Sequence, residues 1–150
     1  MSKSIRMMVT SYGFNDNDPP SADIAYPRSE GNPTRHDRAT EGKGTHDDPI
    51  TFATSSDELP IGTLIYVPHV RKYFIMEDDC VPCGSDWADR QQYHVDLWMG
   101  PGHESDDSAL SDCEDRITRD SAEVIVDPSP DLPVDTTPLF ANDNCSARLH

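Results

Sequence analysis

Several features that would point directly to a function are missing from this sequence of 150 residues. No apolar run approaches the about 20 residues that a membrane-spanning helix needs. The first residues carry Lys3 and Arg6 but no apolar core, so they do not resemble a signal peptide. The Gly-x-x-x-x-Gly-Lys, Gly-x-Ser-x-Gly and His-Glu-x-x-His patterns are also missing, so the common signatures of nucleotide-binding, serine-hydrolase and zinc-protease chemistry are not found.

Basic and apolar residues are scarce. The chain has 12 Lys and Arg against 28 Asp and Glu, which gives a formal net charge of −16. This charge disfavours nucleic acids and anionic membranes as partners, and it suits a neutral or cationic ligand or a metal. The simpler alternative is that the charge only keeps the protein soluble. Hydrophobic residues make up 35%, which predicts a modest core and a considerable share of loop or tail.

Short segments of alternating polarity predict an all-β chain. Thirteen prolines and eight glycines argue against long helices. Alternation and turn residues predict six strands, at residues 5–12, 50–54, 64–67, 73–77, 93–99 and 121–126. The intervening residues 13–50 are rich in Gly, Pro, Asn and Asp. An irregular segment of this length in a compact domain is usually functional or an insertion.

One short helix and three regions complete the expected organisation. Residues 107–116 predict the helix, with Asp106 or Ser108 as its cap. Residues 5–126 are expected to form one domain after an N-terminal extension at 1–4. Residues 127–150 are acidic and rich in proline, which predicts an extended or disordered tail.

The strand at 93–99 offers the clearest set of chemical groups. Successive side chains of a strand point to opposite faces. The apolar set is expected to enter the core, namely Val95, Leu97 and Met99. The other face then presents His94, Asp96 and Trp98. Sugars stack on indole faces, and a carboxyl can exchange a proton with a glycosidic oxygen. The alternative is an ordinary strand whose polar face is solvated.

Three consecutive acids, Glu77, Asp78 and Asp79, end the preceding strand. Crowded carboxylates raise one another's pKa, which is how an acid stays protonated near neutral pH. A solvated strand end and a divalent-metal site are the alternatives.

Residues 10–18 alternate Asp and Asn in the manner of a calcium loop, but the Gly and the closing Glu of an EF-hand are not at the required positions. We expect this segment to line a cleft, with Tyr12 as a sugar platform and Asp16 or Asp18 as a second carboxylate. The alternative is a turn formed by Asx side chains.

The four cysteines permit disulfides or a metal site. A bridge between Cys80 and Cys113 is the first choice, which leaves Cys145 in the tail as a free thiol. The Cys80-x-x-Cys83 spacing also permits a redox or metal pair. A zinc site of Cys80, Cys83, His94 and Cys113 is conceivable by ligand type, but a single Cys-x-x-Cys is a weak signal.

Four segments occur in an order that resembles the double-psi β-barrel superfamily. Residues 10–13 (Thr-Ser-Tyr-Gly) are similar to the opening Thr-x-Tyr-Gly of expansins, and residues 59–68 resemble a Pro-apolar-Gly-Thr turn and strand of rare-lipoprotein-A-like proteins and three-aspartate (3D) domains. Residues 74–79 resemble the next strand, which ends in acids. Residues 94–98 resemble the His-Phe-Asp-Leu of expansins and family 45 glycoside hydrolases. The spacing is most similar to that of the 3D domain, which implies a six-stranded double-psi barrel with long loops.

The resemblance also assigns roles to individual acids. Asp96 matches the catalytic or essential aspartate of these families, and Asp78 matches the strand-end aspartate, with Asp79 as its neighbour. The third aspartate of the 3D domain would fall near Ser55, which is not acidic. Asp16 is the candidate for the N-terminal aspartate of the family 45 hydrolases.

The resemblance implies a lytic transglycosylase or glycoside hydrolase acting on peptidoglycan or another β-linked glycan. Asp96 would be the general acid and base, and Asp78 would tune it. The sugars would be held by the remaining site residues, namely Thr10, Tyr12, Asp16, Asp79, His94 and Trp98. No cofactor or metal is expected. The protein would be a monomer that is secreted or delivered to the cell wall or periplasm, with a cell-wall polysaccharide as partner.

Two other functions stay open from the sequence. One is a non-catalytic wall-binding module, as in expansins. The other is an acidic effector or inhibitor whose surface meets a basic protein partner.

Overall fold

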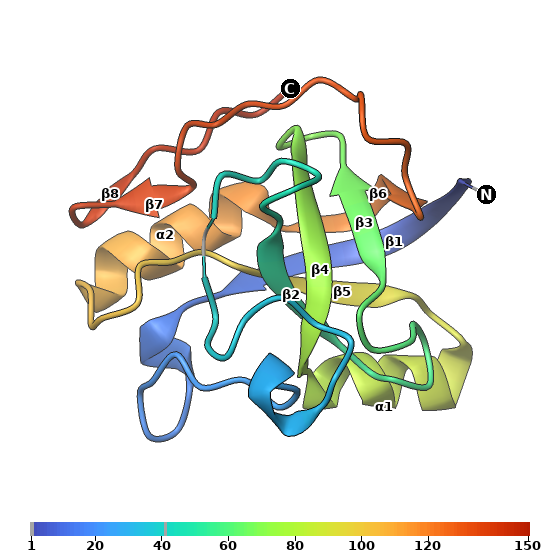
Figure 1. Cartoon of the computed structure of the whole chain (residues 1–150). Helices are drawn as coiled ribbons and strands as arrows, with labels where there is room; N and C mark the ends of the chain where they lie inside the picture. Colours follow the sequence, from blue (N-terminus) through green and yellow to red (C-terminus); the bar gives the residue numbers. More distant parts are fainter. Residues whose placement is uncertain (1, 41) are drawn as a thin grey trace.

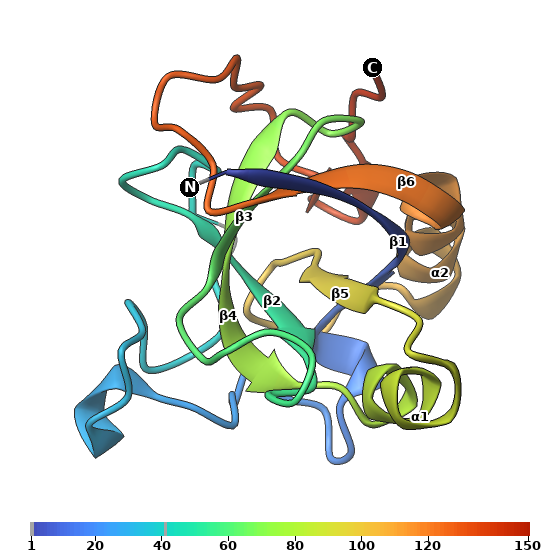
Figure 2. The same cartoon turned by 90° about the vertical axis from the view of Figure 1, so that its right-hand side faces the viewer.

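A closed barrel of six strands forms the centre of the molecule, which is described here from a computed structural model of residues 2–40 and 42–150. The strands are β1 (Lys3–Tyr12), β2 (Ile50–Thr54), β3 (Leu64–Val67), β4 (Lys72–Asp79), β5 (His94–Trp98) and β6 (Arg119–Val126). Their order around the barrel is β1-β5-β2-β4-β3-β6, and Figure 2 looks into this ring. The expected all-β barrel of six strands is therefore confirmed. Met1, part of the expected N-terminal extension, lies outside the described residues, and β1 already includes Lys3.

The barrel mixes parallel and antiparallel pairs. β1 pairs with β5 and β2 pairs with β4 in parallel, whereas the other neighbours are antiparallel. Parallel neighbours need a crossover connection instead of a tight hairpin. The β1–β2 segment (residues 13–40 and 42–49) is the first part of the long connection from β1 to its parallel neighbour β5, and it includes the short 3-10 helices η1 (Phe14–Asp16) and η2 (Arg28–Glu30). This segment lies outside the barrel and passes in front of β2 and β4 (Figure 1).

Gly62 shows how closely the β1–β2 segment approaches the turn before β3. Its φ is +88°, a conformation that L side chains rarely adopt. A Cβ at this position would lie 2.4 Å from the carbonyl oxygen of Pro33. Gly62 is therefore required both by its own backbone and by the segment that packs against it.

The described residues contain two short α-helices instead of the single expected one. α2 (Asp107–Ile117) lies where the sequence predicts it, and Oδ2 of Asp106 accepts a hydrogen bond from the Ala109 N–H at 2.9 Å. α1 (Val81–Arg90) was missed, because its sequence is polar and contains Pro82. Proline is tolerated in the first turn of a helix, and the Cys80 sulfur accepts a hydrogen bond from the Cys83 N–H at the N-cap.

The disulfides differ from the expected pairing. Cys80 is bonded to Cys83, and Cys113 is bonded to Cys145. The expected Cys80–Cys113 bridge and the free Cys145 are therefore wrong, as is the zinc alternative. The first turn of α1 brings Cys80 and Cys83 together, while the tail folds back onto α2 and brings Cys145 to Cys113. In the described part of the chain, no group of three or more His, Cys, Asp or Glu side chains is arranged to hold a metal.

The C-terminal segment, residues 127–150, crosses the top of the view in Figure 1 and packs on the barrel. It contains the small hairpin of β7 (Phe140–Ala141) and β8 (Asn144–Cys145). Leu139 and Phe140 are buried, and the Tyr73 hydroxyl donates to the Ser129 carbonyl at 2.5 Å. This segment is therefore part of the folded unit.

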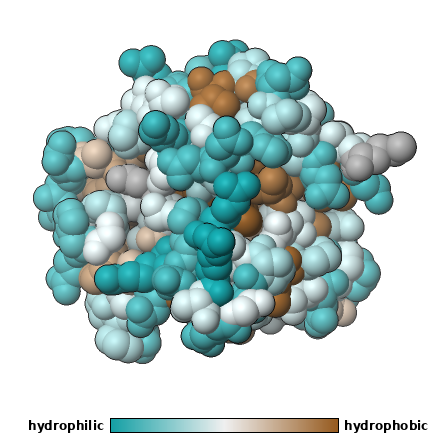
Figure 3. Space-filling view, in the orientation of Figure 1, coloured by the Kyte–Doolittle hydropathy of each residue, from teal (hydrophilic) through white to brown (hydrophobic). Residues whose placement is uncertain are grey.

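The core is apolar and the surface is mostly hydrophilic. The largest fully buried side chains include Phe52, Phe74, Met76 and Leu97, which come from neighbouring strands of the barrel. The face shown in Figure 3 has only small, separate apolar areas. None of the helices described in residues 2–40 and 42–150 is both long enough and apolar enough to span a membrane.

Candidate functional site

Four neighbouring strands bring a row of residues together across the barrel. Thr10 on β1 is paired with Asp96 on β5, Asp96 with Ala53 on β2, and Ala53 with Asp78 on β4. Two strand spacings separate the two aspartates, which places their Cα atoms roughly 10 Å apart. The small side chain of Ala53 stands between them. The sequence prediction that Asp78 and Asp96 belong to one region is thus consistent with the strand register.

Asp96 is half-buried and has the environment of a proton donor. The Thr10 hydroxyl donates to its Oδ1 at 2.9 Å. Burial is the main cause that raises the pKa of Asp96 to about 7; the hydrogen bond from Thr10 opposes the rise, and the charges of Asp16 and Asp78 contribute to it. An acid with this pKa is present in both protonation states at neutral pH, as general acid–base chemistry requires.

Glu114 on α2 adds a third carboxyl to the surroundings of Asp96. The pKa of Glu114 is raised to about 10, chiefly by burial, then by the hydrogen bond and the charge of Asp16, and then by the charge of Asp96. Oε2 of Glu114 is buried without a hydrogen-bond partner among the described residues. Glu114 is therefore protonated at neutral pH and can donate a hydrogen bond.

Asp16 is the exposed member of this group. Its Oδ2 accepts a hydrogen bond from the Gly13 N–H at 2.7 Å, which closes the turn of η1. Its carboxyl is hydrogen-bonded to Glu114, and its charge raises the pKa of Asp96. We name Asp16, Asp96 and Glu114 the carboxyl cluster.

Asp78 is buried beneath Tyr12. The Tyr12 hydroxyl donates to Oδ2 of Asp78 at 2.8 Å, and the backbone N–H of Ala25 donates to Oδ1 at 2.9 Å. Burial raises the pKa of Asp78, and these hydrogen bonds oppose the rise. Burial also raises the pKa of Tyr12, and the charge of Asp78 adds to it. Asp78 therefore anchors the β1–β2 segment and acts on Asp96 through its charge.

On the other side of Asp96, the Thr10 hydroxyl also meets the imidazole of His94. Thr10 Oγ1 lies 2.8 Å from Nε2 of His94. The second ring nitrogen, Nδ1, lies 2.9 Å from Oδ2 of Asp86 on α1. Asp86 also accepts a hydrogen bond from Arg90 at 2.8 Å. The hydrogen bond from His94, followed by that from Arg90, lowers the pKa of Asp86.

Glu58 lies near the position where the family resemblance would require an aspartate. Ser55 itself packs against Gly84 of α1, where an added Cβ would lie 3.6 Å from the Ser55 Cβ. The carboxyl of Glu58 accepts hydrogen bonds from the Thr54 hydroxyl at 2.6 Å and from the His94 N–H at 2.9 Å. Burial raises the pKa of Glu58 to about 7 against these bonds. A carboxyl is thus present in this region, although it comes from another residue.

The structure corrects the expected sugar platforms. Trp98 is 1% exposed and Tyr12 is 8% exposed, and their rings pack edge to face with centroids 5.3 Å apart. His94 is also buried. These aromatic side chains cannot stack on a sugar, because their rings are buried. They support the site from beneath instead.

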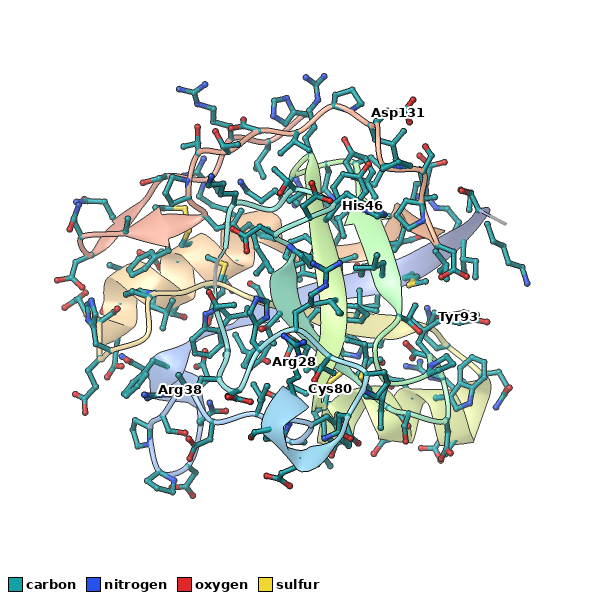
Figure 4. All side chains as sticks on the ribbon, viewed as in Figure 1. Arg28, Arg38, His46, Cys80, Tyr93 and Asp131 are labelled. Carbon is teal, nitrogen blue, oxygen red and sulfur yellow. A yellow bond between two sulfur atoms is a disulfide. The ribbon has the colours of Figure 1, made fainter. Side chains whose placement is uncertain are left out.

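The three acids at the end of β4 occupy different surroundings. Glu77 is fully buried, Asp78 is buried, and Asp79 is exposed. Figure 4 labels Cys80, which follows them at the junction of β4 and α1, and Tyr93, which precedes β5. The predicted cluster of crowded acids is therefore divided, and only Asp78 is electrostatically linked to Asp96. Asp18 is exposed on the β1–β2 segment and takes no part in the carboxyl cluster.

The sequence prediction missed Glu58, Asp86 and Glu114. A signal existed for Glu114, because α2 buries Leu110, Cys113 and Ile117. Glu114 falls at the position four residues after Leu110, which belongs to the same helical stripe. An acid on a buried stripe is unusual unless it is paired or functional. Asp86 lacked such a signal, because α1 itself was not predicted.

A pocket of about 340 Å³ lies elsewhere on the molecule. Its walls include His69, Arg71 and His150. None of its lining residues belongs to the carboxyl cluster or to the row that contains Asp96, so the pocket does not enlarge the candidate site.

The fold and the site define a small disulfide-bonded β-barrel with a carboxyl cluster on neighbouring elements. The chain belongs to the family of the DDB_G0273701 N-terminal domain, whose family model matches residues 4–146. It is 38% identical over 138 residues to the Dictyostelium discoideum protein DDB_G0273701/DDB_G0273221. The match covers 92% of this chain and 57% of that protein, so the chain spans little more than half the length of its relative. No solved structure matches the chain significantly.

Proposed function

We propose that this domain cleaves a β-linked cell-wall glycan, with Asp96 as general acid and base. The observation that carries the proposal is the half-buried Asp96, whose pKa is raised to about 7 beside other carboxyls. A carboxylic acid kept protonated near neutral pH can protonate a departing glycosidic oxygen. The order of sequence motifs similar to those of double-psi barrels supports a glycan as the substrate, and membership of that superfamily stays a prediction.

A lytic reaction needs only the one acid. Asp96 would give its proton to the glycosidic oxygen as the bond to the anomeric carbon breaks. The resulting carboxylate is stabilised by the Thr10 hydroxyl, which donates to Oδ1. The carboxylate would then take the proton of the sugar 6-hydroxyl, whose oxygen closes an anhydro ring. Asp96 ends the cycle protonated, and no water is consumed.

A hydrolytic reaction needs a second carboxylate, and Asp16 is the candidate. It is exposed, is oriented by the Gly13 N–H, and acts on Asp96 through its charge. In this mode Asp16 would activate water while Asp96 protonates the leaving group. The two modes therefore differ in their requirement for Asp16 and in their products.

The two disulfides support an oxidising compartment as the place of action. We include secretion or delivery to the cell wall in the proposal, with the polysaccharide as partner and the monomer as working form. The net charge of −16 would disfavour strongly acidic polysaccharides as substrates.

Product analysis by mass spectrometry tests the proposal. Peptidoglycan, chitin and β-glucan are incubated with wild type, Asp96→Asn, Asp16→Asn and the control Asp112→Asn, an exposed change on α2. Wild type and the control are expected to release fragments, and Asp96→Asn to lose at least about a hundredfold in rate. Anhydro ends with full activity of Asp16→Asn indicate the lytic mode, while reducing ends and an inactive Asp16→Asn indicate hydrolysis.

Two outcomes contradict the proposal. One is the lack of products from every glycan, and the other is an Asp96→Asn variant as active as wild type. Glycan binding without products, unchanged in Asp96→Asn, would support a non-catalytic wall-binding module. Tight binding to a basic protein with neither activity would support an acidic effector or inhibitor.

A further inference from the structure

A continuous chain of hydrogen bonds connects Asp96 to the helix α1. Oδ1 of Asp96 lies 2.9 Å from Oγ1 of Thr10, and the same Oγ1 lies 2.8 Å from Nε2 of His94. Nδ1 of His94 lies 2.9 Å from Oδ2 of Asp86. The chain therefore passes from β5 through β1 and back to β5 before it reaches α1.

The number of available protons limits how this series of hydrogen bonds can be arranged. A threonine hydroxyl has one hydrogen to donate and can accept in return. If Thr10 donates to Asp96, then Nε2 of His94 must donate to Thr10. If Thr10 instead donates to Nε2, then a protonated Asp96 must donate to Thr10. The two arrangements contain the same number of protons and differ only in whether Asp96 or Nε2 carries one of them.

Asp86 fixes the opposite end of the chain. Its pKa is lowered, chiefly by the hydrogen bond from His94 and then by that from Arg90, so Asp86 is ionised at neutral pH. A carboxylate only accepts hydrogen bonds. Nδ1 of His94 therefore carries a proton in both arrangements, and Nε2 is the nitrogen that gains or loses one.

We propose that Asp86, His94 and Thr10 form a proton relay that decides whether the shared proton resides on Asp96 or on His94. Transfer moves the Asp96 proton to Thr10 Oγ1 while the Thr10 hydrogen moves to Nε2. The products are a carboxylate and an imidazolium, and the reverse transfer restores the acid. Asp86 and His94 are positioning residues, and their link to catalysis rests on the proposed function of Asp96.

The charges around Asp96 favour its protonated form, whereas the carboxylate of Asp86 favours the imidazolium form of His94. Asp16, Asp78 and Glu114 face Asp96 from η1, β4 and α2, and each is a carboxyl. Near His94, the Glu58 carboxyl accepts a hydrogen bond from the backbone N–H of His94. Arg90 is the cation bonded to Asp86, and it lies on the far side of that carboxylate from the imidazole chain.

Such a relay would prepare Asp96 for each step of glycan cleavage. With the proton on Asp96, the acid is ready to donate. After donation, the Thr10 hydroxyl can turn its hydrogen from Nε2 to the new carboxylate, which leaves Nε2 without a donor until Asp96 regains a proton from the sugar hydroxyl. The relay thus stabilises both forms of Asp96 without moving any heavy atom.

Nuclear magnetic resonance tests the relay independently of any substrate. The ¹⁵N shift of His94 Nε2 and the ¹³C shift of the Asp96 carboxyl are followed between about pH 4 and about pH 9. In wild type and in Thr10→Ser, the Nε2 signal is expected to move at the pH at which Asp96 titrates. In Thr10→Val the two signals are uncoupled, and the pKa of Asp96 rises because the hydrogen bond that lowers it is lost.

Asp86→Asn gives a second test, with exposed Asp89→Asn on the same helix as its matched control. Replacing the carboxylate is expected to move part of the His94 population to the tautomer protonated at Nε2, whereas the control leaves the ¹⁵N shifts unchanged. If Thr10→Val does not fold, the comparison of Asp86→Asn with Asp89→Asn alone tests the relay. An Nε2 signal that ignores the Asp96 titration in wild type, a coupling that survives Thr10→Val, or identical spectra for Asp86→Asn and Asp89→Asn would overturn the relay.

The relay and the proposed function can fail separately. Coupled titration in a protein that cleaves no glycan rejects only the function. Glycan cleavage that depends on Asp96, without coupling between the two signals, rejects only the relay.

Discussion

Glu77 connects the β1–β2 segment to the barrel through several hydrogen bonds. Its carboxylate is fully buried and accepts hydrogen bonds from the backbone N–H groups of Arg35 and His36, at 2.9 Å and 2.8 Å. The Thr51 hydroxyl donates to it at 2.7 Å, and Nδ1 of His36 lies 2.7 Å away. A buried carboxylate is stable only when it is surrounded by donors in this way.

We expect Glu77→Ala to destabilise the protein by about 3–5 kcal/mol. The change leaves two part-buried backbone N–H groups and a buried hydroxyl without their acceptor, and such groups are costly when unpaired. Glu77→Gln should lose less, because the amide oxygen still accepts. Urea unfolding measures the difference, with exposed Glu30→Gln in the same segment as control. Equal stability of Glu77→Ala and the control would contradict this account.

The neighbouring acids show why the sequence predicted only part of the site. Alternation along β5 predicted Asp96 on the same face as His94, because strand periodicity is local. The surroundings of Glu77 and Asp78 depend on His36 and Tyr12, which are 41 and 66 residues away in the chain. Nothing in the local sequence indicates that one of these acids is fully enclosed while Asp79 stays exposed.

At the scale of elements, the two helices hold carboxyls of the site and are each fixed by a disulfide. α1 carries Asp86 and begins at the Cys80–Cys83 bridge. α2 carries Glu114 and is joined through Cys113 to the C-terminal segment. α2 was predicted because Asp106 is a strong N-cap, whereas α1 lacks an apolar stripe and has a cysteine at its cap.

The two disulfides should contribute unequally to stability. The Cys113–Cys145 bridge spans a sequence separation of 32 and the Cys80–Cys83 bridge one of 3. A longer closed loop restricts the unfolded chain more, so we expect the Cys113→Ala/Cys145→Ala variant to lose about 3–4 kcal/mol and Cys80→Ala/Cys83→Ala about 2 kcal/mol. Urea unfolding under non-reducing conditions checks the order. A larger loss for the short loop would show that α1 depends on its bridge for more than chain entropy.

At the scale of the whole molecule, the closed barrel was predictable from the sequence, but the packing of other segments on the barrel was not. The six strands follow from alternation and from the turns around residues such as Gly62. The folding back of residues 127–150 was not evident, because the apolar pair Leu139 and Phe140 is short and is surrounded by polar and proline-rich sequence. Trp98 is buried against Tyr12, although alternation placed it on the polar face.

Buried carboxyls also govern how the stability of the whole molecule depends on pH. Burial raises the pKa of Glu58 and of Asp96 to about 7 and that of Glu114 to about 10. Each group holds its proton more tightly when folded, so the stability it provides is complete below about pH 4 and is lost as the pH rises through the folded pKa. Asp135 acts in the opposite sense, because the hydrogen bond from Thr137 is the main cause that lowers its pKa to about 2.

We therefore expect the protein to be more stable at about pH 5 than at about pH 8, with a further loss below about pH 4 as Asp135 is protonated. Thermal unfolding across this range measures the effect. Asp96→Asn removes one ionising group, so its melting temperature should exceed that of wild type at the higher pH and should vary less between the two. Exposed Asp112→Asn serves as the control and should follow wild type. A melting temperature that rises between these two pH values would show that Glu58, Asp96 and Glu114 are not held protonated by the fold.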